Sequence, residues 1–200
     1  RRSSDLRNSF ALATLAAALA AVLALLLGFA ARGGRRLSML ANRVVGLGYA
    51  VPGSAIAVGV LIPVTRLDHW LAALWQQLTG ANPGLILTGG IAALVYAYLV
   101  RFLAVALQPV EAGLGRITPS MEAAAQSLGS SPGETLRRVH LPLMRGSLLT
   151  AALLVFVDVM KELPATLVMR PFNFDTLATQ TFTLAADERL AEASTAALAC

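Results

Sequence analysis

The sequence predicts an all-α protein that crosses a membrane several times. Hydrophobic residues make up 56% of its 200 positions, charged residues make up 14%, and the mean hydropathy is +0.68. An ordinary soluble domain carries about 25% charged residues, so this chain lacks the polar side chains to cover a surface facing water. Its apolar residues gather in continuous runs, several of them long enough for a spanning helix of about 20 residues. A membrane β-barrel would instead alternate apolar and polar residues.

The composition excludes several other classes of protein. Intrinsic disorder requires low hydrophobicity. The only cysteine, Cys200, cannot form a disulfide framework, and together with His69 and His140 it cannot complete a closed zinc site. We therefore expect no cofactor and no metal site. The net charge of +5 comes from arginines and Lys161 scattered between the apolar runs, so we expect no nucleic-acid partner.

We expect four complete spans, with membrane lipid around them, and the start of a fifth. They cover about residues 10–31, 44–64, 85–107 and 148–169, with the truncated fifth from about residue 190. The chain starts with Arg1 rather than Met and stops inside an apolar run, which we interpret as a fragment. Arginines concentrate in residues 32–43 and 101–145. The positive-inside rule therefore places these two segments in the cytoplasm.

A short amphipathic helix is predicted after the second span. One helical stripe contains Leu67, Trp70, Leu71, Leu74, Trp75 and Leu78. Thr65 and Asp68 have the spacing of a helix cap, and Gly80 can end the helix. Tryptophan favours the headgroup region, so the helix either lies on the outer membrane surface or packs inside the protein.

Two short helices are predicted in the long polar connection 108–146. The first covers about residues 119–128, and Gly129 after it can adopt the left-handed conformation that ends a helix. The second covers about residues 131–140, because Ser131 has a glutamate at capping-box spacing and Pro142 disfavours continuation. The expected result is a pair of rigid helices with a sharp bend between them.

This connection resembles the signature loop of the permeases of binding-protein-dependent ABC importers. The family pattern is Glu-Ala-Ala, three residues, Gly, nine residues, Ile, one residue, Leu-Pro. Here Gly129 is followed, after nine residues, by Val-His-Leu-Pro. The glutamate position holds Ala123, and Glu122 stands one residue earlier. By this resemblance the ATPase-coupling residues are Glu122, Ala123, Ala124, Gly129, Val139, Leu141 and Pro142.

The resemblance implies a helical bundle of the type I ABC importer permease kind, in a bacterial inner membrane. In that family the loop forms coupling helices, which dock into a cleft of cytoplasmic ATPase subunits. The other implied partners are a periplasmic binding protein and a second permease half or copy. We expect the chain to be a transport subunit and not an enzyme, because its only lysine, Lys161, is not in the Walker A motif of an ATPase. A secondary transporter without an ATPase partner stays open as an alternative.

Further strings resemble iron(III) ABC transporter permeases. They are residues 101–104, 111–114 and, most specifically, 160–179. This resemblance implies that Fe(III) is the substrate, delivered by a periplasmic ferric-binding protein, and that the chain is most of the second half of such a permease. Thiamine, a polyamine or an oxyanion such as sulfate would use the same coupling loop and stay open as alternatives.

Three charged residues, Asp158, Lys161 and Glu162, lie inside the fourth apolar run. Each charge at a helix centre costs about 2.5–3.5 kcal/mol on insertion. Asp158 is spaced to pair with Lys161 and to share a face with Glu162. We expect a polar cluster that faces the translocation pathway, with a structural ion pair as the alternative. Pro164 should break or kink the helix, and Arg101 should snorkel from the end of the third span.

Overall fold

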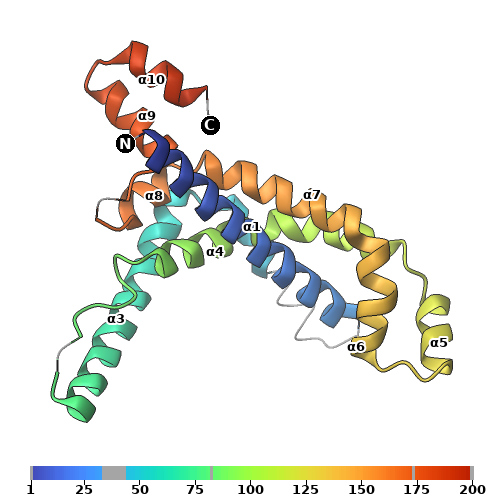
Figure 1. The fold of residues 1–200 in the computed structure, drawn as a ribbon. Coiled ribbons are helices and arrows are strands. Elements are labelled where there is room, and N and C mark those ends of the chain that lie inside the picture. The colour runs from blue at the N-terminus through green and yellow to red at the C-terminus, as the bar shows by residue number, and fades with distance from the viewer. Residues whose placement is uncertain (1, 33–43, 82, 173, 199–200) are drawn as a thin grey trace. The chain divides into compact units, whose positions relative to one another are not determined.

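The computed structural model describes residues 2–32, 44–81, 83–172 and 174–198 (Figure 1). These residues contain helices and no strand, which confirms the predicted all-α class. The elements are α1 (Arg2–Arg32), η1 (Gly48–Ala50), α3 (Gly53–Thr79), α4 (Ile91–Gly115), α5 (Pro119–Ser127), α6 (Pro132–Thr135), η2 (Leu136–His140), α7 (Leu141–Met160), α8 (Pro164–Met169), α9 (Leu177–Ala186) and α10 (Leu190–Ala197).

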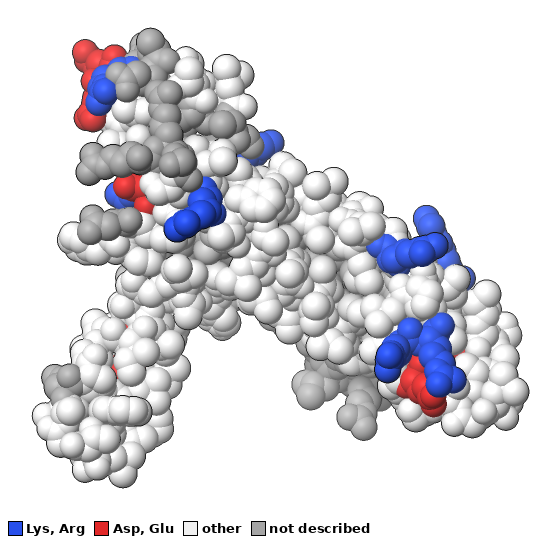
Figure 2. Space-filling model, viewed as in Figure 1, with Lys and Arg blue, Asp and Glu red and all other residues white. Residues whose placement is uncertain are grey.

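Four helical stretches of the described chain are long and apolar enough to cross a membrane. They are Ser4–Arg32, Gly53–Thr79, Ile91–Gly115 and Pro132–Met160. Figure 2 shows a broad uncharged surface on one face of the molecule, with the charged side chains gathered in a few groups. The first stretch matches the predicted span closely, whereas the other three begin or end elsewhere than predicted.

The helix that contains most of the predicted second span, residues 44–64, has different limits from that span. The helix begins at Gly53, after Pro52, and continues through Pro63 to Thr79. The amphipathic stripe is therefore the second half of α3 and forms no separate helix. We attribute the continuity to packing on either side of Pro63, where Val60 and Asp68 are both buried. As predicted, Gly80 ends the helix, with a φ of 73° and its N–H bonded to the Gln76 carbonyl.

Asp68 does not act as the predicted helix cap. Its side chain is fully buried, and its carboxylate accepts the backbone N–H groups of Ile86 at 2.8 Å, Leu87 at 3.0 Å and Thr88 at 2.7 Å. These three residues belong to the predicted third span, residues 85–107. Because Asp68 holds them in a turn against α3, the helix α4 begins only at Ile91.

The polar connection is shorter than the predicted 108–146 because α4 continues past Pro109 to Gly115. Val110 and Leu114, beyond the proline, are both buried. A Cβ atom on Gly28 of α1 would lie 2.7 Å from Leu114 Cδ1. The close contact between α1 and α4 at this point explains why the helix survives the loss of one hydrogen bond.

The second helix of the connection was predicted to stop before Pro142, but it continues. It runs through α6 and η2 into α7, with the Leu141 N–H bonded to the Leu136 carbonyl in a widened π-helical turn. We interpret this turn as the adjustment that lets Pro142, which has no N–H, lie inside a helix. The fourth span then ends at Met160 and not at residue 169, since the predicted break occurs before Pro164.

The chain divides into two compact units, with Arg1–Ala16, Val51–Arg101 and Val157–Cys200 in the first, and Ala17–Ala50 and Phe102–Phe156 in the second. In the first unit α3 packs against α8, and α9 packs against α10. In the second unit α5 contacts α6 and η2. Sequence analysis had not predicted α9, whose start is capped by the Thr176 side chain.

The close approach of α4 and α7 at Gly113 generates a prediction about stability. A Cβ atom there would lie 2.6 Å from Ser147 Oγ and 2.8 Å from Ser147 Cβ. We expect Gly113→Leu to destabilise the protein by about 1–3 kcal/mol, as overpacking does. Thermal unfolding of the purified protein in detergent measures this. Gly115→Leu is the control, because nothing lies within 4 Å of a Cβ atom at Gly115, and an equal loss in both variants would contradict the interpretation.

Candidate functional site

The predicted pair of short helices is present in the second unit, with a tight bend between them. Gly129 follows α5 with a φ of 85°, a conformation that glycine adopts without the strain other residues incur. The Ser131 side chain accepts the N–H of Glu134 at 3.3 Å and so caps α6, as predicted. The bend and the cap give α5 and α6 defined ends.

Glu122, in the first turn of α5, lies at the centre of a polar cluster. Its Oε1 atom accepts a hydrogen bond from Arg32 Nη1 at 2.7 Å and lies 2.9 Å from His140 Nε2. The side chains of Arg32 and Glu122 are each 25% exposed, while that of His140 is fully buried. One carboxylate oxygen therefore joins the last residue of α1, the start of α5 and the end of η2.

Two more contacts strengthen this cluster. Arg32 Nη2 also donates to the carbonyl of Ile117, just before α5. The Phe29 ring meets the His140 ring edge to face, with 5.0 Å between centroids and 82° between planes. Sequence analysis missed Arg32 and His140 as partners of Glu122, because 90 residues separate Arg32 from Glu122 and no local spacing signals such a contact.

The other predicted coupling residues lie on or beside these helices and are mostly exposed. Ala123, Ala124, Gly129 and Pro142 are exposed, Leu141 is 37% exposed, and Val139 is half-buried. Next to them, Leu128 is 88% exposed. Arg138 pairs with Glu134 at 2.8 Å on the outer side of the helix, and charged side chains gather over this region in Figure 2. This surface combines an exposed leucine with charged side chains, as the apolar core and polar rim of a protein interface do.

A second polar cluster lies in the first unit, where α7 gives way to α8. Glu162 is only 6% exposed; its Oε2 atom lies 3.5 Å from Arg101 Nε, and its Oε1 atom accepts the N–H of Ala165 at 3.1 Å. Arg101 is in the middle of α4, and its side chain is 20% exposed. The prediction that Arg101 snorkels from a helix end is therefore wrong, because it pairs with a buried acid.

The start of α3 closes over this ion pair. A Cβ atom on Gly53 would lie 2.1 Å from Arg101 Nη1 and 2.4 Å from Glu162 Oε1, so a larger residue there would displace the paired ends of these side chains. Beside the pair, the Thr166 hydroxyl donates to the Glu162 carbonyl at 2.6 Å, and the Tyr98 hydroxyl therefore donates to Thr166 Oγ1 at 2.5 Å. The cluster links α3, α4 and α8.

The three charged residues predicted for the pathway have different surroundings. Asp158 is half-buried and interacts electrostatically with Lys161 and Arg101. Lys161 is exposed, and Glu162 is buried against Arg101. Within the described residues, no group of three or more His, Cys, Asp or Glu side chains could hold a metal ion.

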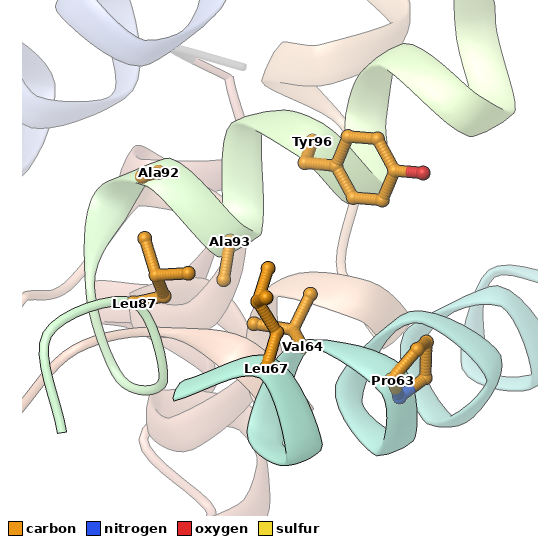
Figure 3. Close-up of a pocket in the computed structure, with 7 residues that line it drawn as sticks. All are labelled: Pro63, Val64, Leu67, Leu87, Ala92, Ala93 and Tyr96. Carbon is orange, nitrogen blue, oxygen red and sulfur yellow. The ribbon is translucent and has the colours of Figure 1, made fainter. Parts of the chain in front are cut away.

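A separate cavity of about 340 Å³ lies between α3 and α4 in the first unit. Its lining is apolar and consists of Pro63, Val64, Leu67, Leu87, Ala92, Ala93 and Tyr96 (Figure 3). The Tyr96 hydroxyl is the only polar side-chain group among these lining residues. The cavity therefore offers a charged substrate no counter-charge.

Comparison with known proteins shows similarity to components of transport systems. A family model described as the binding-protein-dependent transport system inner membrane component matches residues 20–177. The chain is 30% identical over 196 residues to the Fe(3+)-transport system permease protein FbpB 2 of Haemophilus influenzae, which covers 98% of this chain and 36% of that relative. The chain thus spans about a third of that relative's length.

A second relative carries a different substrate in its name. It is a protein of Salmonella typhimurium provisionally named the 2-aminoethylphosphonate transport system permease protein PhnV. The identity is 30% over 136 residues, which covers 68% of this chain and 45% of that relative.

The buried pair of Arg101 and Glu162 generates a double-mutant prediction. Arg101→Met and Glu162→Gln should each destabilise the protein by about 3–5 kcal/mol, because each leaves an uncompensated buried charge. The double variant should lose clearly less than the sum of the two. Thermal unfolding in detergent is the measurement.

The exposed pair of Arg138 and Glu134 is the matched control. Their side chains are 71% and 38% exposed, so Arg138→Met and Glu134→Gln should each cost less than about 1 kcal/mol. If the stability losses of Arg101→Met and Glu162→Gln simply added in the double variant, the two charges would not stabilise one another.

Proposed function

The chain belongs to the family of binding-protein-dependent transport system inner membrane components, and from this premise we propose that it forms part of the translocation pathway of an ABC importer for Fe(III). Family members are membrane components of transport systems, so ATP hydrolysis belongs to separate subunits. In our proposal the partners are cytoplasmic ATPase subunits, a periplasmic ferric-binding protein and a second permease half or copy.

The continuity of α6, η2 and α7 carries the mechanical part of this proposal. The three elements form one helical stretch, Pro132–Met160, without a break. A displacement applied to α6 by a docked ATPase subunit would therefore move the whole stretch, whereas a flexible loop would absorb it. The exposed alanines of α5 and the bend at Gly129 would supply the docking surface. This is how closure of the ATPase subunits would reach the membrane.

The substrate part of the proposal rests on similarity. The iron relative aligns over 98% of this chain, against 68% for the phosphonate relative. Residues 160–179, which resemble iron(III) permeases, include the break between α7 and α8. The phosphonate relative makes an organic phosphonate the second candidate substrate.

We propose that Asp158 and Lys161 face the translocation pathway and that Glu162 has mainly a structural part. The half-buried Asp158, in the last turn of α7, and the exposed Lys161, just after it, leave charge accessible at the end of an apolar helix, which is typical of transport pathways. Glu162 is instead occupied by Arg101 and by the start of α8. Conduction requires weak, temporary binding, and an accessible acid beside a lysine meets that requirement.

The bend at Gly129 can be tested with one substitution and one control. Gly129→Val places a β-branched residue at a φ of 85°, where left-handed backbone costs about 1–2 kcal/mol for L-residues. We expect the ATPase subunits to co-purify less, and uptake to fall about tenfold or more, with membrane insertion intact. Gly133→Ala, where nothing lies within 4 Å of the added Cβ atom, should behave as the parent. Normal uptake by Gly129→Val would argue against a coupling role for this bend.

Substrate identity can be tested by uptake into cells that lack the gene, with and without complementation. We expect complementation to restore uptake of radioactive Fe(III) alone. Labelled 2-aminoethylphosphonate, thiamine, a polyamine and sulfate are the parallel arms. If complementation restored uptake of one of these compounds and not of Fe(III), the importer function would stand and the substrate would be that compound.

A further inference from the structure

We infer that Arg32, at the end of α1, is a positioning residue that couples the docking helix α5 to the first span. The inference rests on the proposed function, because it concerns how a movement of α5 reaches the membrane. The continuous stretch of α6, η2 and α7 begins after the bend at Gly129, whereas α5 lies before it. Besides that bend, α5 contacts α6 and η2, and neither of these contacts joins α5 to α1.

The geometry of the guanidinium supports this role. Arg32 Nη1 donates to Glu122 Oε1 at 2.7 Å, and Nη2 donates to the Ile117 carbonyl. The two acceptors lie before α5 and in its first turn, so one side chain holds the beginning of this helix at two points. Arginine can do this because its donors form a rigid fork, whereas the ammonium group of lysine is a single point charge.

Glu122 extends the same link to η2. The oxygen atom that accepts from Arg32 also lies 2.9 Å from Nε2 of His140, whose Nδ1 lies 3.2 Å from the Thr135 carbonyl. His140 is fully buried, and Phe29, one turn before Arg32, packs against its ring. The carboxylate of Glu122 is thus used within the chain.

The expected consequence is that α1 and α5 move together. A push on α5 would be carried through Glu122 to Arg32 and into the first span, while the stretch through η2 carries it into α7. Removing Arg32 would leave the exposed docking residues and the contact between Glu122 and His140 in place, but it would break the link between α5 and α1. The ATPase subunits would then bind and hydrolyse ATP with less transport for each ATP.

The test uses the complete transporter reconstituted in proteoliposomes, with its ATPase subunits and binding protein. The variants are Arg32→Met, Arg32→Lys and the charge exchange of Arg32→Glu with Glu122→Arg. Arg116→Met is the matched control, because it removes an exposed arginine a few residues before α5. Three quantities are measured: co-purification of the ATPase subunits, the rate of ATP hydrolysis, and the substrate transported per ATP.

We expect Arg32→Met to retain the ATPase subunits and to transport about tenfold less substrate per ATP. Arg32→Lys should recover part of this loss, since it keeps the contact with Glu122 alone, and the charge exchange should also recover part. Arg116→Met should transport as the parent does. An unchanged ratio in Arg32→Met would overturn the inference, and so would loss of the ATPase subunits, which would mean that Arg32 only shapes the docking surface.

Failure of the inference is distinguishable from failure of the proposed function. If Gly129→Val loses transport while Arg32→Met keeps a normal ratio, the proposed function stands and the link through Arg32 does not. If both variants transport normally, the docking segment itself has no coupling role.

A distance measurement between α1 and α5 tests the inference without relying on transport activity. Spin labels at Ala30 of α1 and Gln126 of α5, both exposed, report the separation of these helices with and without trapped ATP. In the parent this separation should stay constant between the two states. In Arg32→Met it should differ between them, and a constant separation in that variant would overturn the inference.

Discussion

An interrupted helix in an apolar protein leaves backbone N–H groups that must find partners within the chain, because lipid offers none. Two carboxylates meet this requirement. Asp68 accepts three N–H groups of the turn before α4, and Glu162 accepts one at the start of α8. In the polar connection, the Ser131 hydroxyl caps α6 in the same way. The acids in these positions thus make the interruptions possible.

Two acids face arginines that are distant in the sequence. Glu162 pairs with Arg101, and Glu122 pairs with Arg32. Burying a carboxylate such as that of Glu162 costs several kcal/mol unless a positive charge compensates it, and between membrane helices there is no hydrophobic driving force to supply the difference. Glu122 lies instead in the polar connection and is 25% exposed. Each pair therefore joins two elements, and close approach at Gly53 lets a third element cover the first pair.

Local sequence patterns predicted which segments form helices more accurately than the residues at which those helices begin and end. Periodicity and caps indicated the first span, the bend at Gly129, the end of α3 at Gly80 and the break before Pro164, because each depends on neighbouring residues. The limits at Pro63, Pro109 and Pro142 were wrong for a common reason. Proline removes one hydrogen bond, but packing around it, or a widened π-helical turn, keeps the helix continuous.

The amino-acid sequence by itself determined the membrane class, the all-α fold and the position of the bend at Gly129, because hydrophobicity and glycine-proline spacing are local properties. Only the tertiary structure decided the partners of the charged residues. The resemblance gave Glu122 as an ATPase-coupling residue but indicated no partner within the chain, and the structure pairs it with Arg32 and His140. Arg101 was predicted at a helix end, and the structure places it beside Glu162. A buried charge takes whichever opposite charge the fold brings near, and the packing of distant helices decides which one that is.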